Sequence, residues 1–238
     1  MCWNFEVSLS FAIVHLLSSI YVGWKKPRYY RKFIIFMMCY SCIELLEALQ
    51  WYVGVEQNLN SSTCKLSNTL LTVVAYILIW IQPIMFSLFS VKGDFRFPLY
   101  YSIYAFILAL LTLTLGFIHP SVGLQSMGLT EKNNYGRYTC TYMGKYGHLV
   151  WKFAVSSFVY QPTHFVYHSI ILLVFVLHYD LTLKLTMALG WTITLFISMY
   201  RLGTTPAEQA SYWCFLSIFA DIPILIYTTI YIRKTKKM

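Results

Sequence analysis

Seven long runs of mostly apolar residues are the feature of this sequence that most limits its fold. About 20 such residues are needed for a helix to cross the hydrocarbon core of a bilayer. Charged residues make up only 11% of the chain, against roughly 25% in a typical soluble domain. We therefore expect an all-α membrane protein, a seven-transmembrane-helix bundle in which residues 1–238 form one domain. The predicted spans are residues 7–24, 33–53, 69–91, 99–118, 155–179, 181–200 and 212–232.

Much of the net charge of +9 comes from two short basic clusters, one after the first span and one after the last. The clusters consist of Lys25, Lys26, Arg28, Arg31 and Lys32, and of Arg233, Lys234, Lys236 and Lys237. Basic loops stay on the cytoplasmic side, so this pattern predicts an outside N-terminus and a cytoplasmic C-terminus. The expected partner is the lipid bilayer and not nucleic acid, because no basic soluble element is present. The plasma membrane, the endoplasmic reticulum and a viral envelope all suit this topology.

Two loops that this topology places outside have features of an oxidising compartment. Asn60 begins the sequence NSS, which is a glycosylation sequon. Cys64 precedes the third span, and Cys140 lies in the long loop of residues 119–154. As the two cysteines of the outer loops, they predict a disulfide that ties the long loop over the bundle. Two free thiols are the alternative.

The second span carries two carboxylates at a depth where a bilayer offers no water. Glu44, Glu47 and Gln50 lie three residues apart in the stretch SCIELLEALQW, and this spacing places them on one side of a helix. A charge at such a depth costs at least about 2.5–3.5 kcal/mol on insertion scales. Such a pair of carboxylates can exchange a proton, bind a cation or hydrogen-bond to a neighbouring helix.

Further polar residues lie at similar depth in other spans, and polar groups inside a membrane face inward toward partners. Two of these residues closely precede Pro83 and Pro223, and Pro162 predicts a similar kink in the fifth span. Proline frees helix carbonyls, which then line a cavity together with a nearby polar side chain. The residues in question are His15, Gln82, His168 and Asp221.

These side chains predict a buried ion- or ligand-binding cluster, and hence a channel or transporter for protons, cations or a small polar solute. The structural alternative is hydrogen bonding between helices, which normally uses Ser, Thr, Asn or Gln rather than Glu, Asp and His. A small ion or polar ligand is the expected partner, and no cofactor is expected. A homo-oligomer stays open as an alternative.

Two other functions remain open. One is a receptor-like seven-helix binding protein, which would not hold retinal because the last span has no lysine for a Schiff base. The other is a zinc-dependent intramembrane lipid hydrolase. In that case His164 and His168, four residues apart, would hold the metal from one helix face. Glu47 or Asp221 would add a carboxylate, and Ser41 would orient a water. An enzyme is the less favoured interpretation.

The N-terminal sequence MCWNFEVS and the second span also carry a family resemblance. Cys2, Trp3 and Asn4 precede a first span, a basic loop and a second span with Glu47 and Gln50. This arrangement resembles a family of short seven-transmembrane proteins associated with large DNA viruses and single-celled eukaryotes. The resemblance implies the seven-span architecture but no particular activity. From the residues alone, we expect Trp3 in the headgroup region and Asn4 as the N-cap of the first helix.

Overall fold

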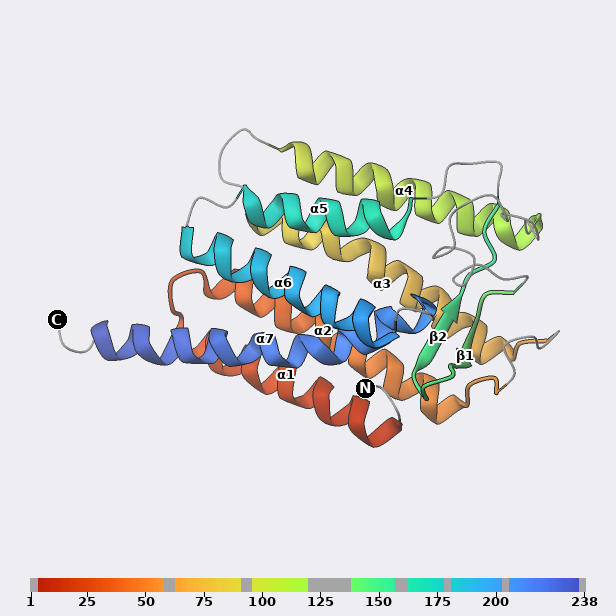
Figure 1. The fold of residues 1–238 in the computed structure, drawn as a ribbon, viewed down its shortest axis with the longest axis horizontal. Helices are drawn as coiled ribbons and strands as arrows, with labels where there is room; N and C mark the ends of the chain where they lie inside the picture. Colours follow the sequence, from red (N-terminus) through yellow and green to blue (C-terminus); the bar gives the residue numbers. More distant parts are fainter. Residues whose placement is uncertain are drawn as a thin grey trace.

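The computed structural model describes residues 4–57, 63–90, 96–119, 138–156, 162–177, 181–202 and 206–235. Those residues form seven helices and one antiparallel hairpin. Figure 1 shows the helices side by side with their long axes roughly aligned, and the hairpin across one end of the bundle. The elements are α1 (Phe5–Lys25), α2 (Tyr30–Val53), α3 (Leu66–Ser90), α4 (Phe97–Ile118), β1 (Cys140–Met143), β2 (Leu149–Lys152), α5 (His164–Val176), α6 (Leu181–Leu202) and α7 (Pro206–Thr235).

Within the described residues, five helices are long and apolar enough to cross a bilayer. These segments are Phe5–Lys25, Tyr30–Val53, Leu66–Leu88, Phe97–Ile118 and Glu208–Ile232. Helix α5, with 13 residues, is shorter than a bilayer requires. The all-α prediction is thus confirmed as a mostly helical fold with five candidate spans.

The predicted fifth span, residues 155–179, is wrong at its start. Helix α5 begins only at His164, because Thr163 is its N-cap and accepts a hydrogen bond from the Val166 N–H at 3.3 Å. Pro162 therefore precedes the helix and does not kink it. The apolar residues just after β2 pack against α4 instead, where the Ser156 N–H donates to the Thr112 carbonyl at 3.0 Å.

Helices α1 and α2 pack closely along their length. Asn4 is the N-cap of α1, as expected, since its Oδ1 accepts a hydrogen bond from the Val7 N–H at 2.9 Å. The Ser41 hydroxyl of α2 donates to the Ala12 carbonyl of α1 at 2.8 Å. Small side chains such as these let two helix backbones approach each other. The pair therefore brings the polar residues of α2 close to those of α1.

An aromatic cluster fills the space between α3, α5, α6 and α7. The rings of Trp191 and Trp213 meet edge to face with their centroids 4.0 Å apart. Tyr167 contacts both tryptophans and also Trp80. Each such aromatic pair contributes about 0.5–1.5 kcal/mol beyond the area it buries. The cluster packs α6 and α7 together, and these two helices line most of the cavity described below.

Candidate functional site

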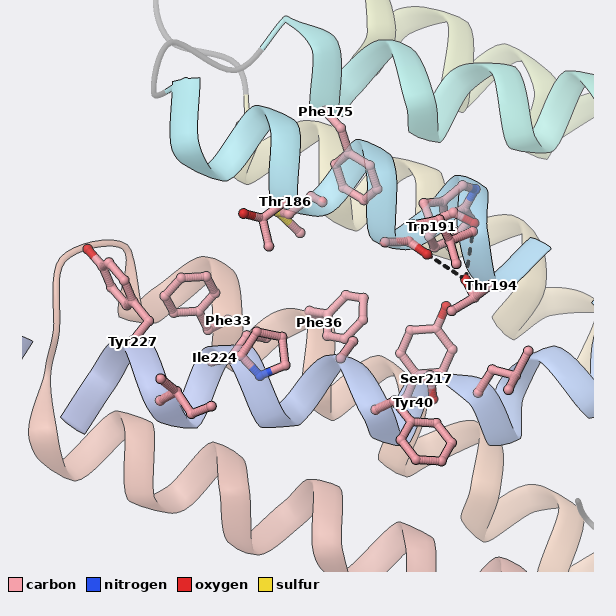
Figure 2. Close-up of a pocket in the computed structure, with 18 of the residues that line it drawn as sticks. Phe33, Phe36, Tyr40, Phe175, Thr186, Trp191, Thr194, Ser217, Ile224 and Tyr227 are labelled. Carbon is pink, nitrogen blue, oxygen red and sulfur yellow. Dashed lines mark hydrogen bonds between the residues drawn. The ribbon is translucent and has the colours of Figure 1, made fainter. Parts of the chain in front are cut away.

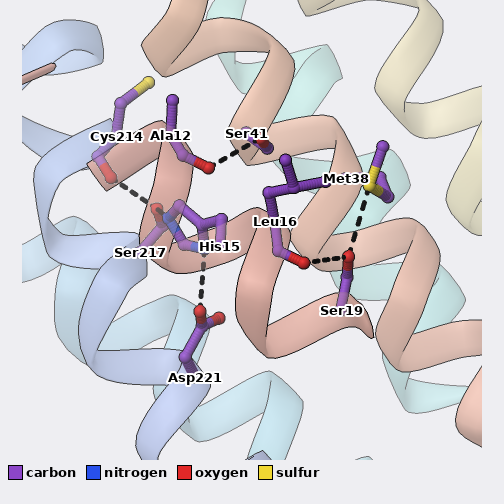
Figure 3. A network of polar contacts seen from close by, with 9 residues as sticks. All are labelled: Ala12, His15, Leu16, Ser19, Met38, Ser41, Cys214, Ser217 and Asp221. Carbon is purple, nitrogen blue, oxygen red and sulfur yellow. Dashed lines mark hydrogen bonds and ion pairs between the residues drawn. The ribbon is translucent and has the colours of Figure 1, made fainter. Parts of the chain in front are cut away.

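His15 of α1 and Asp221 of α7 meet in the interior of the bundle. His15 Nδ1 lies 3.0 Å from Asp221 Oδ2, and both side chains are almost fully buried. The other ring nitrogen, His15 Nε2, lies 3.2 Å from the Ser217 hydroxyl, one turn before Asp221 on α7. Figure 3 shows this chain of contacts, together with the hydrogen bond from Ser217 to the Cys214 carbonyl. Three polar groups from two helices are thereby in contact within the bundle interior.

The two carboxylates of the second helix are also in the interior. Glu44 and Glu47 both have 0% exposure. Both lie within electrostatic range of the Cys214 thiol of α7, and Glu44 also lies within range of the Tyr40 phenol. The Tyr40 ring stacks on His15 with 5.9 Å between the centroids. The carboxylate pair and the His15–Asp221 pair therefore belong to one polar region, with Tyr40 between them.

Gln82 and His168 lie beside the aromatic cluster. The Tyr167 hydroxyl donates to Gln82 Oε1 in a short hydrogen bond. The His168 ring packs edge to face against Trp213, at 5.0 Å between centroids, and against Trp191. The structure thus brings His168 next to aromatic rings, and Gln82 to a tyrosine.

Gln50 joins a separate network at the hairpin end of the bundle. Its Nε2 donates to Thr141 Oγ1 at 2.8 Å, and its Oε1 accepts from Trp151 Nε1 at 3.0 Å. Asn68 of α3 pairs with the Thr141 backbone through two bonds of 2.9 Å. The Thr72 hydroxyl lies 2.7 Å from that of Thr141. Gln50 therefore clamps the hairpin to the helices, and its amide atoms are occupied.

A disulfide and a buried glutamate hold the same hairpin from two further sides. Cys64, just before α3, is bonded to Cys140 of β1, which confirms the predicted disulfide. The Glu208 carboxylate of α7, 1% exposed, accepts a hydrogen bond from the Tyr146 N–H at 3.1 Å in the hairpin turn. Gly144 leaves the room for it, since a Cβ there would lie 2.2 Å from Glu208 Cδ. The long loop is thus fixed over one end of the bundle.

A cavity of about 530 Å³ lies between α2, α5, α6 and α7. Its wall is mostly apolar, and Figure 2 shows aromatic rings around it. Several of its lining residues are strongly exposed on the outside of the bundle, including Ile193 (55%), Phe219 (52%) and Ile226 (54%). We refer to it as the α6–α7 cavity, because these residues border its mouth. Its few hydroxyl groups belong to Tyr40, Thr186, Thr194, Ser217 and Tyr227.

The α6–α7 cavity and the buried polar region share two residues. Ser217 and Tyr40 line the cavity, and each also contacts His15. Figure 2 places both at one end of the cavity. An apolar molecule in the cavity would therefore have one end next to a hydroxyl and a phenol, with the imidazole of His15 behind them.

The predicted glycosylation site and the predicted metal site fall partly outside the described residues. Asn60 lies outside the described residues, as does the side chain of His164. In the described part of the chain, one group of side chains is close enough together to hold a metal, and it consists of Glu56, Cys64 and Cys140. Two of these residues form the disulfide and so offer no thiolate. Nothing in this geometry adds support to a zinc site at His168.

Sequence reasoning missed Ser217, Tyr40 and Glu208. Serine and tyrosine in an apolar helix give no signal by themselves, because their role depends on which residues of other helices face them. Glu208 gave a weak signal, since an acidic residue in the first turn of a helix suits the helix dipole. Its partner, the hairpin turn after Gly144, could not be inferred from that position.

These residues define the class of the protein: it is a helical bundle in which buried Glu, His and Asp side chains lie beside an apolar cavity. The chain belongs to a family of unknown function, DUF5765, whose model matches residues 6–237. It is 33% identical over 239 residues to "Uncharacterized protein R287" of Acanthamoeba polyphaga mimivirus, covering 97% of this chain and 96% of that protein. This relative agrees with the resemblance to proteins of large DNA viruses. No solved structure is significantly similar to the chain.

Proposed function

We propose that this chain is an integral membrane protein, a seven-helix bundle in which at least the five long apolar helices cross the bilayer, and that it binds an acyl chain of a membrane lipid in the α6–α7 cavity. Five apolar helices of spanning length support the membrane location. Large apolar side chains on their outer faces also support it, for example Leu17 (59% exposed) and Ile107 (50% exposed). In a soluble protein, exposed apolar surface of this extent would cause association.

The proposed orientation has the N-terminus and the hairpin outside and the C-terminus in the cytoplasm. The Cys64–Cys140 disulfide supports it, because disulfides persist on the oxidising side of a membrane. The basic turn between α1 and α2 and the last residues of α7 lie at the opposite end of the bundle from the hairpin (Figure 1), as the distribution of positive charge requires. The plasma membrane, the endoplasmic reticulum and a viral envelope each provide such a pair of compartments.

The single observation that carries the binding function is the α6–α7 cavity. Its volume of about 530 Å³ lies in the range of about 300–1,000 Å³ typical of small-molecule sites. Its mouth is bordered by exposed apolar residues, which face acyl chains if α6 and α7 span a bilayer. Lipids are then the molecules that can enter from the side. The hydroxyls of Ser217 and Tyr40 add polar groups at one end, which suits a chain that carries an ester or a hydroxyl.

Photo-crosslinking in vesicles tests this binding. The probe is a phosphatidylcholine with a diazirine on one acyl chain, mixed into unlabelled phosphatidylcholine. We expect adducts on the buried cavity residue Trp191 to saturate with probe concentration, whereas adducts on exposed Leu17 rise in proportion to it. Adducts on Trp191 that are absent, or that do not saturate, would contradict the proposal.

Gly190 provides the matched variant for this experiment. A Cβ at this cavity-lining position meets nothing within 4 Å, so a larger side chain fits there without a clash. Gly190→Leu is expected to fill the cavity and to abolish the Trp191 adducts while leaving the Leu17 adducts. Leu189→Phe changes an exposed neighbour outside the cavity (56% exposed) and should leave both unchanged.

Proton or cation transport is a second candidate, and the burial of Glu44 and Glu47 favours it. Both are at 0% exposure near His15 and Asp221, and buried acidic groups at membrane depth commonly mark proton or ion pathways. Proton flux is measured in proteoliposomes that hold a pH-sensitive dye. This candidate predicts a flux that is lost in Glu47→Gln and kept in Glu56→Gln, a control at the hairpin. Equal flux in both variants would refute it.

A further inference from the structure

We propose that Ser217, His15 and Asp221 act as nucleophile, general base and orienting carboxylate in cleaving the ester bond of a lipid bound in the α6–α7 cavity. This inference rests on the proposed lipid binding and adds a reaction to it. Ester cleavage of this kind requires a hydroxyl that faces the substrate, a base within reach of that hydroxyl, and a group that holds the base in place. The structure offers one residue for each of these roles.

The contacts of the two ring nitrogens of His15 have the order that acyl transfer needs. Nδ1 lies 3.0 Å from Asp221 Oδ2, and Nε2 lies 3.2 Å from Ser217 Oγ. The nearby carboxylate favours the tautomer with the proton on Nδ1, and in that tautomer Nε2, next to the serine, carries the lone pair. The burial of His15 (0% exposed) and Asp221 (2% exposed) keeps the ring in this orientation.

Ser217 is the member of the set that reaches the substrate. It lines the α6–α7 cavity, whereas His15 and Asp221 lie behind it. Its hydroxyl donates to the Cys214 carbonyl, as Figure 3 shows. Rotation about the Cβ–Oγ bond turns the hydroxyl proton away from the carbonyl and toward His15 Nε2 without any movement of the backbone.

Tyr40 is the donor available to the developing oxyanion. It lines the same end of the cavity as Ser217, and its ring stacks on His15. A phenol that faces the cavity can donate a hydrogen bond to the carbonyl oxygen as negative charge forms there. Tyr40 thus supplies the electrostatic stabilisation that a lone triad would lack.

The reaction balances with water as the second substrate. Ser217 Oγ forms a bond to the ester carbonyl carbon while its proton passes to His15 Nε2. The carbon–oxygen bond to the alcohol then breaks, and the alcohol leaves with that proton. A water next attacks the acyl-serine and gives a proton to His15 Nε2. Return of this proton to Ser217 releases the fatty acid and restores the hydroxyl.

Labelling with an alkyl fluorophosphonate tests the nucleophile. This probe bonds to an activated serine oxygen with loss of fluoride, and its alkyl chain fits an apolar cavity. We expect one adduct, on Ser217, in the intact protein in phosphatidylcholine vesicles. Ser217→Ala and His15→Gln should lose it. Ser41→Ala should keep it, since Ser41 is a buried serine that bonds to the Ala12 carbonyl and does not line the cavity.

Hydrolysis of monooleoylglycerol in the same vesicles provides the second readout. Ser217→Ala should lower oleate release at least about a hundredfold. Asp221→Asn, which removes the positioning carboxylate, should reduce the rate by a similar factor and alter its pH profile, because the imidazole then loses its orientation and charge partner. A rate that falls in Asp221→Asn with an unchanged pH profile would assign Asp221 a merely structural role and overturn the triad.

The crosslinking experiment separates failure of the triad from failure of lipid binding. Saturable Trp191 adducts without fluorophosphonate labelling would overturn the hydrolase and leave the binding function in place. Absence of both would overturn both. Ser217→Ala should still give the Trp191 adducts, because a hydroxyl is lost and the apolar wall remains.

Discussion

The clamp between Gln50 and the hairpin leads to a prediction whose size can be worked out from its bonds. In Gln50→Leu the side chain stays similar in size but can neither donate to Thr141 nor accept from Trp151. Trp151 Nε1 loses its acceptor at 3.0 Å in a side chain that is 3% exposed. An orphaned buried donor costs about 1–3 kcal/mol. Thr141 loses less, because its hydroxyl still lies 2.7 Å from that of Thr72.

Together these losses predict that Gln50→Leu lowers the free energy of unfolding by about 2–4 kcal/mol. Unfolding by sodium dodecyl sulfate in mixed micelles measures this change. Gln57→Leu, the same substitution at an exposed residue, should have little effect and serves as the control.

A double-mutant cycle makes the test specific to the hydrogen bond. Trp151→Phe removes the indole N–H, so adding it to Gln50→Leu leaves no orphaned donor. The cycle should therefore give a coupling energy of about 1 kcal/mol or more. The reasoning is refuted if the two effects add without coupling, or if Gln50→Leu is as stable as the wild type.

Two other predictions concern the segment around the hairpin. Gly116→Ala should destabilise the fold by about 1–3 kcal/mol, because its Cβ would lie 2.1 Å from the Ala154 carbonyl oxygen. Gly190→Ala, whose Cβ meets nothing, is the thermal-denaturation control, and equal stability of the two variants would contradict this packing. Burial lowers the pKa of His148 from 6.5 to about 4. Between these two pH values the unfolded chain binds a proton at His148 and the folded chain does not. The contribution of neutral His148 to the free energy of unfolding is therefore complete above about pH 6.5 and is lost as the pH falls toward 4. The melting temperature should therefore drop more between pH 7 and pH 4 in the wild type than in His148→Gln. The same drop in both proteins would contradict a contribution of His148 to the pH dependence.

Much of the helical fold could be predicted from the sequence, because long apolar runs leave a chain few other options. The lengths of α1, α2, α3, α4 and α7 follow from those runs. The start of α5 could not be predicted in this way, since Val155 is apolar, yet the segment of Val155 and Ser156 lies against α4 instead of beginning a helix. The hairpin was missed because each strand has only four residues, too few to show a clear alternation.

The candidate site could be predicted only in its ionisable members. The depth of His15 and Asp221 within their spans indicated that they could meet, and the structure places them 3.0 Å apart. Gln50 lies at the expected end of α2, but its partners come from the hairpin. The contribution of Ser217 and Tyr40 depends on how α1, α2 and α7 are rotated toward one another. Helices that are apolar on most sides give little information about that rotation.

Native mass spectrometry of the protein released from detergent tests the central claim, occupancy of the α6–α7 cavity, most directly. We predict one lipid-sized adduct on the wild type that resists collisional removal. It should be present in Leu189→Phe and absent from Gly190→Leu. A wild type without retained lipid, or an adduct that persists unchanged in Gly190→Leu, would contradict the proposal that this cavity binds a lipid chain.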